Sequence, residues 1–67
     1  MTIPKQVLID TWKAETALLI IQQGHYALAD ALNFAEASFD NIDGDIETVL
    51  PQECIDEEVS AASADAV

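Results

Sequence analysis

The spacing of apolar residues constrains the fold of this chain more than any other feature. From residue 28 to residue 49, apolar side chains recur at alternating steps of four and three: Leu28, Leu32, Ala35, Phe39, Ile42, Ile46 and Val49. A sustained spacing of this kind is typical of the seam along which one helix packs against another. We therefore predict an all-α fold in which one helix covers residues 26–50.

Gly44 lies inside this seam, and residues 41–44 are also typical of a turn. Gly in a helix interior costs about 1 kcal/mol relative to Ala, whereas full burial of an Ile or Val side chain contributes roughly 1.5–3 kcal/mol. Burial of Ile42, Ile46 and Val49 therefore favours one continuous helix that is at most bent at Gly44. The alternative is a break at residues 41–44 followed by a short third helix.

A first helix is predicted over residues 3–23. Thr2 is a suitable N-cap, Pro4 fits the first turn, and Gly24 can end the helix because it tolerates a positive φ. The apolar seam again steps by four and three, and it consists of Val7, Thr11, Ala14, Leu18 and Ile21. Residues 17–21 are apolar at every angle around the helix, which indicates burial on more than one side.

After the second helix the chain changes in character. Pro51 disfavours helical geometry in the residue before it, so we expect the helix to end there. Residues 52–67 are acidic and contain few large apolar side chains, of which Ile55 and Val59 are two. They predict a disordered acidic tail that follows a helical domain of residues 1–51.

Two helices joined by a short connection form an antiparallel hairpin, and a chain of 67 residues buries little surface by itself. Cys54 is the only cysteine and His25 the only histidine, so neither a disulfide within the chain nor a Cys/His metal site can complete the core. A single hairpin also leaves Trp12, Leu19 and Ile20 partly uncovered. We therefore expect a two-fold homodimer, that is, a four-helix bundle.

Charge is distributed unevenly along the sequence. The net charge is −11, and both basic residues, Lys5 and Lys13, lie near the start, where Asp10 and Glu15 balance them. The remaining acids follow from Asp30 onward without a base. Such a surface repels nucleic acid and anionic membranes and attracts basic proteins. No apolar run approaches the roughly 20 residues of a membrane span, and no signal peptide is recognisable, so we expect a cytoplasmic protein.

In the predicted second helix, carboxylates lie opposite the seam. They are Asp30, Glu36, Asp40, Asp43 and Glu47. The last four step by four, three and four, which predicts a row along one helix face with about 5–6 Å between neighbours. This row is interpreted as a docking face for a basic partner, in one version by mimicry of DNA. A solvated face that maintains solubility is the competing interpretation.

The residue pattern does not support a catalytic function or a bound cofactor or metal. His25 and Cys54 are isolated from each other and from a suitable third group, and no glycine-rich phosphate loop is present. Alignment of Gly44 with the glycine of a calcium-binding loop places Phe39 and Leu50 at positions that require oxygen ligands. We predict neither enzymatic activity nor a bound cofactor or metal.

These observations favour a small acidic protein that binds and inhibits or modulates a larger protein, in the manner of compact regulators that phages and mobile elements carry. Trp12 and Phe34, together with Leu19 and Ile20, are predicted to lie in the dimer interface or to anchor the partner. Two alternatives remain at this point. One is a DNA mimic that occupies the nucleic-acid site of a basic protein, and the other is a structural oligomerisation module.

Overall fold

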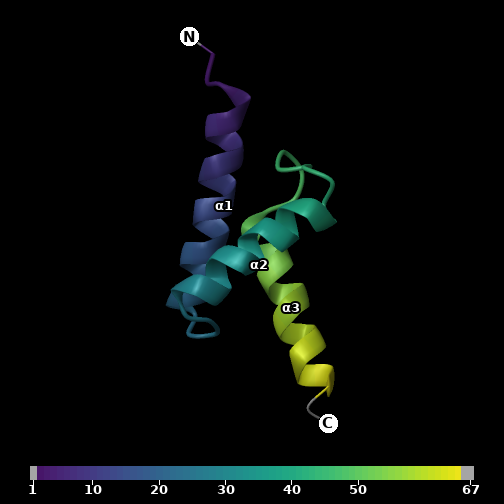
Figure 1. Ribbon diagram of the computed structural model, residues 1–67. Helices are drawn as coiled ribbons and strands as arrows, with labels where there is room; N and C mark the ends of the chain where they lie inside the picture. The colour runs from purple at the N-terminus through teal and green to yellow at the C-terminus, as the bar shows by residue number, and fades with distance from the viewer. Residues whose placement is uncertain (1, 66–67) are drawn as a thin grey trace.

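The computed structural model describes residues 2–65, and in that part of the chain it contains three helices (Figure 1). They are α1 (Lys5–Gln22), α2 (Leu28–Asn41) and α3 (Pro51–Asp65). The predicted all-α class is confirmed, whereas the predicted two-helix hairpin is wrong. Both α2 and α3 pack mainly on α1, and the two chain termini point to opposite ends of an elongated molecule of 49 × 21 × 15 Å.

The first helix begins and ends close to the predicted positions. Pro4 occupies the N-cap position in place of Thr2. At the other end, Gly24 adopts a φ of 79° and the N–H of His25 donates to the carbonyl of Ile20 at 3.1 Å. This is the Schellman arrangement, in which a left-handed glycine lets the chain fold back onto the last helical turn.

The second helix ends at Asn41, so the predicted continuous helix to residue 50 is wrong. Asp43 and Gly44 both adopt positive φ values, 54° and 77°, and the N–H of Gly44 donates to the carbonyl of Phe39 at 3.1 Å. The same Schellman arrangement therefore ends α2 at the turn-like residues.

The connection of residues 42–50 buries apolar side chains without being helical. Ile42, Ile46 and Val49 are all half-buried in it. The carbonyl of Val49 also accepts a hydrogen bond from the indole N–H of Trp12 at 2.9 Å, which ties the connection to α1. Because these side chains are half-buried without a continuous helix, their burial gives no advantage to a helix that would have to contain Gly44.

The third helix covers most of the segment predicted to be a disordered tail, and that prediction is wrong for residues 52–62. Residues 66 and 67 lie outside the described part of the chain. Pro51 begins this helix at its first position, where the missing N–H costs nothing. Glu53, two residues later, accepts a hydrogen bond from the N–H of Leu50 at 3.2 Å, which is one half of a capping box.

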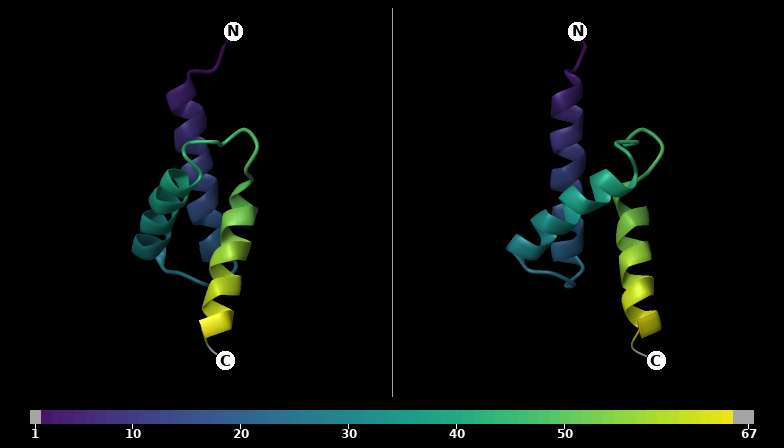
Figure 2. Two further views of the ribbon diagram at one scale, coloured as in Figure 1. Left: turned by 90° about the vertical axis from the view of Figure 1, so that its right-hand side faces the viewer. Right: turned by 45° about the vertical axis from the view of Figure 1, so that its right-hand side comes forward.

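An apolar stripe docks α3 on α1. Pro51, Cys54 and Ile55 are buried and Val59 is half-buried, at the spacing of one helix face. Ile55 is completely buried and belongs to the same core cluster as Ile20 of α1. Figure 2 shows that the axes of α2 and α3 point in different directions. The third helix thus covers the side of α1 that we expected a second hairpin to cover.

Small residues form the contact between α1 and α2. Ala17 of α1 and Ala31 and Ala35 of α2 are almost fully buried, which lets the two helix backbones approach closely. Ala35 belongs to the predicted seam and is buried, but the leucines of that seam face outward: Leu32 is 50% exposed and Leu28 is 63% exposed. The helix was predicted correctly, but its buried face is turned toward Ala31 and away from these two leucines.

Candidate functional site

The structure separates the five carboxylates that were predicted to form a docking face. Asp30, Glu36 and Asp40 are exposed on α2, whereas Asp43 and Glu47 are exposed in the connection that follows it. Because α2 ends before residue 43, the predicted regular row on one helix is wrong. Exposure of all five side chains still leaves each carboxylate accessible to a partner.

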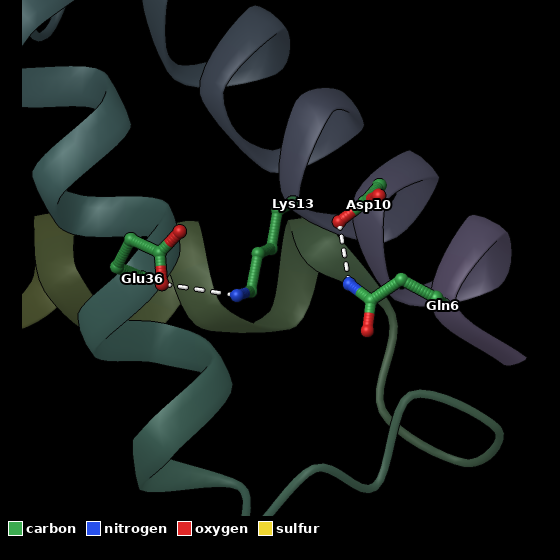
Figure 3. A network of polar contacts seen from close by, with 4 residues as sticks. All are labelled: Gln6, Asp10, Lys13 and Glu36. Atoms are coloured by element: carbon green, nitrogen blue, oxygen red, sulfur yellow. Dashed lines mark hydrogen bonds and ion pairs between the residues drawn. The ribbon is translucent and has the colours of Figure 1, made fainter.

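Glu36 is engaged by a base of the same chain. The ammonium of Lys13 lies 2.9 Å from its carboxylate (Figure 3) and also 4.6 Å from the centre of the Phe39 ring. On the neighbouring part of α1, the side-chain amide of Gln6 donates to Asp10 at 2.9 Å. An exposed ion pair of this kind contributes about 0–1 kcal/mol, so its main effect is to reduce the negative charge beside α1.

The predicted interface residues occupy two different environments. Trp12 is 5% exposed and Ile20 is fully buried, so both belong to the core of the single chain. Leu19 and Phe34 are half-buried and pack against that core. Phe34 also contacts Tyr26 edge to face, with ring centres 5.9 Å apart. Of the four residues, Phe34 is therefore the aromatic that a partner can reach.

Phe34 lies where α2 and α3 diverge, and two adjoining hollows are found there. The first, of about 270 Å³, is lined by Phe34, Ser38, Asn41, Ile42, Cys54, Glu57, Glu58 and Ala61. The second, of about 370 Å³, is lined by Tyr26, Asp30, Asn33, Phe34, Ala37 and Glu58. Because they share Phe34 and Glu58, we treat them as one surface and name it the α2–α3 groove.

The groove combines apolar and acidic side chains. Phe34 and Ile42 are half-buried, and Asp30, Glu57 and Glu58 contribute carboxylates. No basic side chain lines either hollow within the described residues. The groove therefore offers apolar contact and negative charge in the same place.

Two titratable groups respond to this environment. Partial burial, followed by the nearby carboxylates of Glu58 and Asp30, raises the pKa of the Tyr26 phenol. Burial, followed by the charge of Glu57, raises the pKa of the Cys54 thiol, although its hydrogen bond with Ser38 acts in the opposite direction. Burial is the larger cause of both pKa shifts, and the carboxylates that line the groove add to it because they oppose the formation of another anion.

Sequence reasoning missed this groove because its α3 side was assigned to a tail. The missed signal was local. The sequence Leu-Pro-Gln-Glu at residues 50–53 places proline and glutamate where a helix start favours them. Ile55 and Val59 then follow at a spacing of four, with Cys54 beside the first. Read together, they predict an amphipathic helix with Glu57 and Glu58 near its apolar stripe.

Within residues 2–62, no group of three or more His, Cys, Asp or Glu side chains is arranged to hold a metal ion. Over the same residues, no helix has both the length and the apolar content that crossing a membrane requires. His25 is exposed in the connection between α1 and α2, and Cys54 is a buried residue of α3. The two residues therefore belong to separate parts of the structure.

The fold and the groove define a small, acidic, three-helix protein with a mixed apolar and acidic surface. Comparisons of the chain with protein-family models, with curated proteins and with solved structures found no match. Function therefore has to be inferred from the chain's own surfaces.

Proposed function

We propose that this chain is a non-catalytic protein-binding module that docks on a basic surface of a larger protein and thereby inhibits or modulates it. The observation that carries the proposal is the α2–α3 groove, where the half-buried Phe34 is surrounded by carboxylates of Asp30, Glu57 and Glu58. An aromatic at the centre of a charged rim is typical of protein interfaces. A matching partner segment presents an apolar side chain flanked by lysine or arginine.

Charge supports the choice of a basic partner. The chain carries a net charge of −11, which accelerates encounter with a basic surface. The apolar residues of the groove provide a contact from which water is excluded, and such a contact slows dissociation of the complex. Binding at this site should therefore weaken with salt and still depend on Phe34.

Two features disfavour a catalytic role. The raised pKa of Cys54 reduces the thiolate that a nucleophilic cysteine requires. His25 lies in a different connection and is exposed, so it is not positioned to activate that thiol. We therefore keep the proposal to binding.

Mimicry of DNA is the weaker proposal on this structure. It depends on a regular row of carboxylates, whereas Asp43 and Glu47 lie beyond the end of α2 and Lys13 pairs with Glu36. Docking through the groove requires only the carboxylates around Phe34. The protein-binding proposal therefore needs fewer additional assumptions.

The first experiment is a titration of ¹⁵N-labelled protein with a synthetic helical peptide that carries leucines along one face and lysines along both edges of that face. We expect amide shifts concentrated at residues 34–42 and 54–61. Phe34→Ala should weaken binding by at least about tenfold, a typical loss at an interface hot spot. Glu57→Gln with Glu58→Gln should reduce the salt dependence. A matched control, Glu47→Gln, changes one exposed acid outside the groove and should have little effect.

Shifts spread over all acidic residues, or equal affinity of the Phe34→Ala variant, would show that the peptide responds only to net charge. Capture from a lysate of the source organism, washed at low and high salt, then identifies the natural partner. Retention by wild type and loss by the Phe34→Ala variant is the expected result.

A further inference from the structure

The hollow beside Tyr26, which forms one end of the α2–α3 groove, combines two aromatic rings with two carboxylates. Tyr26 and Phe34 contact each other edge to face, with ring centres 5.9 Å apart and 66° between the ring planes. Both rings line the hollow, and so do Asp30 of α2 and Glu58 of α3. The hollow therefore contains both kinds of group that attract a cation, a π-electron surface and negative charge.

The two carboxylates act on the same end of the hollow. After burial, the charge of Glu58 and then that of Asp30 raise the pKa of the Tyr26 phenol, so both acids lie near its oxygen. Asp30 and Phe34 are four residues apart on α2 and therefore share one face of that helix. Glu58 reaches the hollow from α3. A cation bound here is held by acids from two helices.

A second site on α2 shows how such a set of groups holds a cation. The ammonium of Lys13 lies 2.9 Å from the carboxylate of Glu36 (Figure 3) and 4.6 Å from the centre of the Phe39 ring. An acid and an aromatic residue one turn apart on α2 thus already bind a basic side chain. Asp30 and Phe34 repeat this pair, with a second ring and a second acid added.

The chain has no base of its own to place in this hollow. Its two basic residues are Lys5 and Lys13. Lys13 pairs with Glu36, and Lys5 lines a separate hollow at the start of α1. Among the described residues no basic side chain lines the hollow beside Tyr26, and this includes the neighbouring His25. A cation that fills the hollow therefore belongs to another molecule.

The shape of the hollow favours a guanidinium over an ammonium. The hollow is shallow and open, with a volume of about 370 Å³. A guanidinium is planar, stacks flat on an aromatic ring, donates to carboxylates with a fixed fork of N–H groups and is only weakly hydrated. An ammonium in such an open position keeps most of its water and gains less from the rings.

We propose that the hollow beside Tyr26 binds the guanidinium of an arginine from the partner, stacked on the Tyr26–Phe34 ring pair and donating to Asp30 and Glu58. The inference deepens the proposed function and rests on it, because this arginine belongs to the segment that docks in the α2–α3 groove. It adds a requirement to that segment: an arginine beside its apolar stripe, for which lysine is a poor substitute.

The first measurement tests the hollow without a partner. ¹⁵N-labelled full-length protein is titrated at constant ionic strength with N-acetylarginine amide and, separately, with N-acetyllysine amide, which has the same charge. The arginine compound should shift the amides of residues 26–37 and of Glu58, with a Kd in the millimolar range. It should bind at least about threefold more tightly than the lysine compound, because only the guanidinium stacks well on the rings.

Two variants remove one acid each from the two sides of the hollow. Asp30→Asn and Glu58→Gln should each weaken binding of the arginine compound at least about fivefold, because each removes one charged hydrogen-bond acceptor. Asp40→Asn is the matched control: it makes the same change at another exposed acid of α2, outside the hollow, and should bind like wild type. Circular dichroism of each variant should show wild-type helicity.

The second measurement connects the hollow to the partner. The leucine and lysine peptide described above is compared with a version in which arginine replaces every lysine. Wild type should bind the arginine version at least about threefold more tightly. Asp30→Asn should remove most of this difference, whereas Asp40→Asn should retain it.

The outcomes separate the two proposals. Equal binding of the two small compounds, or equal effects of Asp30→Asn and Asp40→Asn, would overturn the arginine site. The proposed function survives that result if the lysine peptide still binds in the groove and still depends on Phe34. Binding of the arginine compound in the hollow, with neither peptide bound in the groove, would instead support the cation site and refute docking of the partner.

Discussion

Replacement of Ile55 by alanine tests whether α3 is part of the folded domain. Ile55 is fully buried and contacts the core cluster that contains Ile20. Truncation of a buried Ile to Ala costs about 2–5 kcal/mol, because transfer free energy is lost and a cavity remains. A domain of 67 residues has a free energy of unfolding of only roughly 3–10 kcal/mol at 0.05–0.15 kcal/mol per residue. We therefore expect Ile55→Ala to remove a large part of the total stability.

The assay is urea unfolding at one fixed protein concentration, followed by circular dichroism and by the fluorescence of Trp12, the only tryptophan. Leu50→Ala is the matched control: it removes the same number of carbon atoms from a side chain that is 63% exposed. Its expected cost is below about 0.5 kcal/mol. Equal midpoints for the two variants would refute the docking of α3 and restore the flexible tail expected from composition.

Three further predictions concern single contacts. Trp12→Phe should lower the free energy of unfolding by about 1–3 kcal/mol in the same urea assay, because the carbonyl that accepts the indole N–H is left without its partner. Gly44→Ala should cost about 1–2 kcal/mol, because a positive φ disfavours a side chain and its Cβ would lie 3.4 Å from the Phe39 ring. Gly24→Ala, at a similar φ of 79° but with no atom within 4 Å of the added Cβ, should cost no more than this in the same urea assay. Finally, the pKa of the Cys54 thiol is raised in the folded state. The unfolded state then loses this proton first as pH rises above about 8.5. Stability should fall through that range in wild type, and this part of the fall should be absent from the Cys54→Ala variant in urea titrations between pH 7 and pH 10.

Local capping chemistry was predictable from the sequence where no competing signal existed. Gly24 ends α1 as expected, since the preceding helix and the following polar residue offered no alternative. At Asp43 and Gly44 the same helix-capping signal competed with apolar residues spaced alternately by four and three, and the prediction gave more weight to that spacing. The structure shows why that was a poor choice: the non-helical connection already half-buries Ile42, Ile46 and Val49.

The buried face of a helix was not predictable from periodicity alone. Leu28, Leu32 and Ala35 share one apolar pattern, yet Ala31 and Ala35 face the core while the two leucines are at least half exposed. Which face is buried depends on how many helices share the core, and α3 had been assigned to a tail. The same omission hid the groove, because Cys54, Glu57 and Glu58 can line it beside α2 only when residues 51–65 form a helix.

The direction of α3 implies a gradient of local stability along this helix. Its first turns are fixed by Ile55 and by the hydrogen-bonded pair of Gln23 and Gln52, whereas Ser60 and Ala61 are exposed and continue away from α1. Amide hydrogens should therefore exchange slowly near Ile55 and progressively faster toward the carboxyl end, because opening that end breaks few apolar contacts. A partner seated between α2 and α3 would hold the outer turns in place. Slower exchange there would then report occupancy of the groove, even for a ligand that leaves the helical content unchanged.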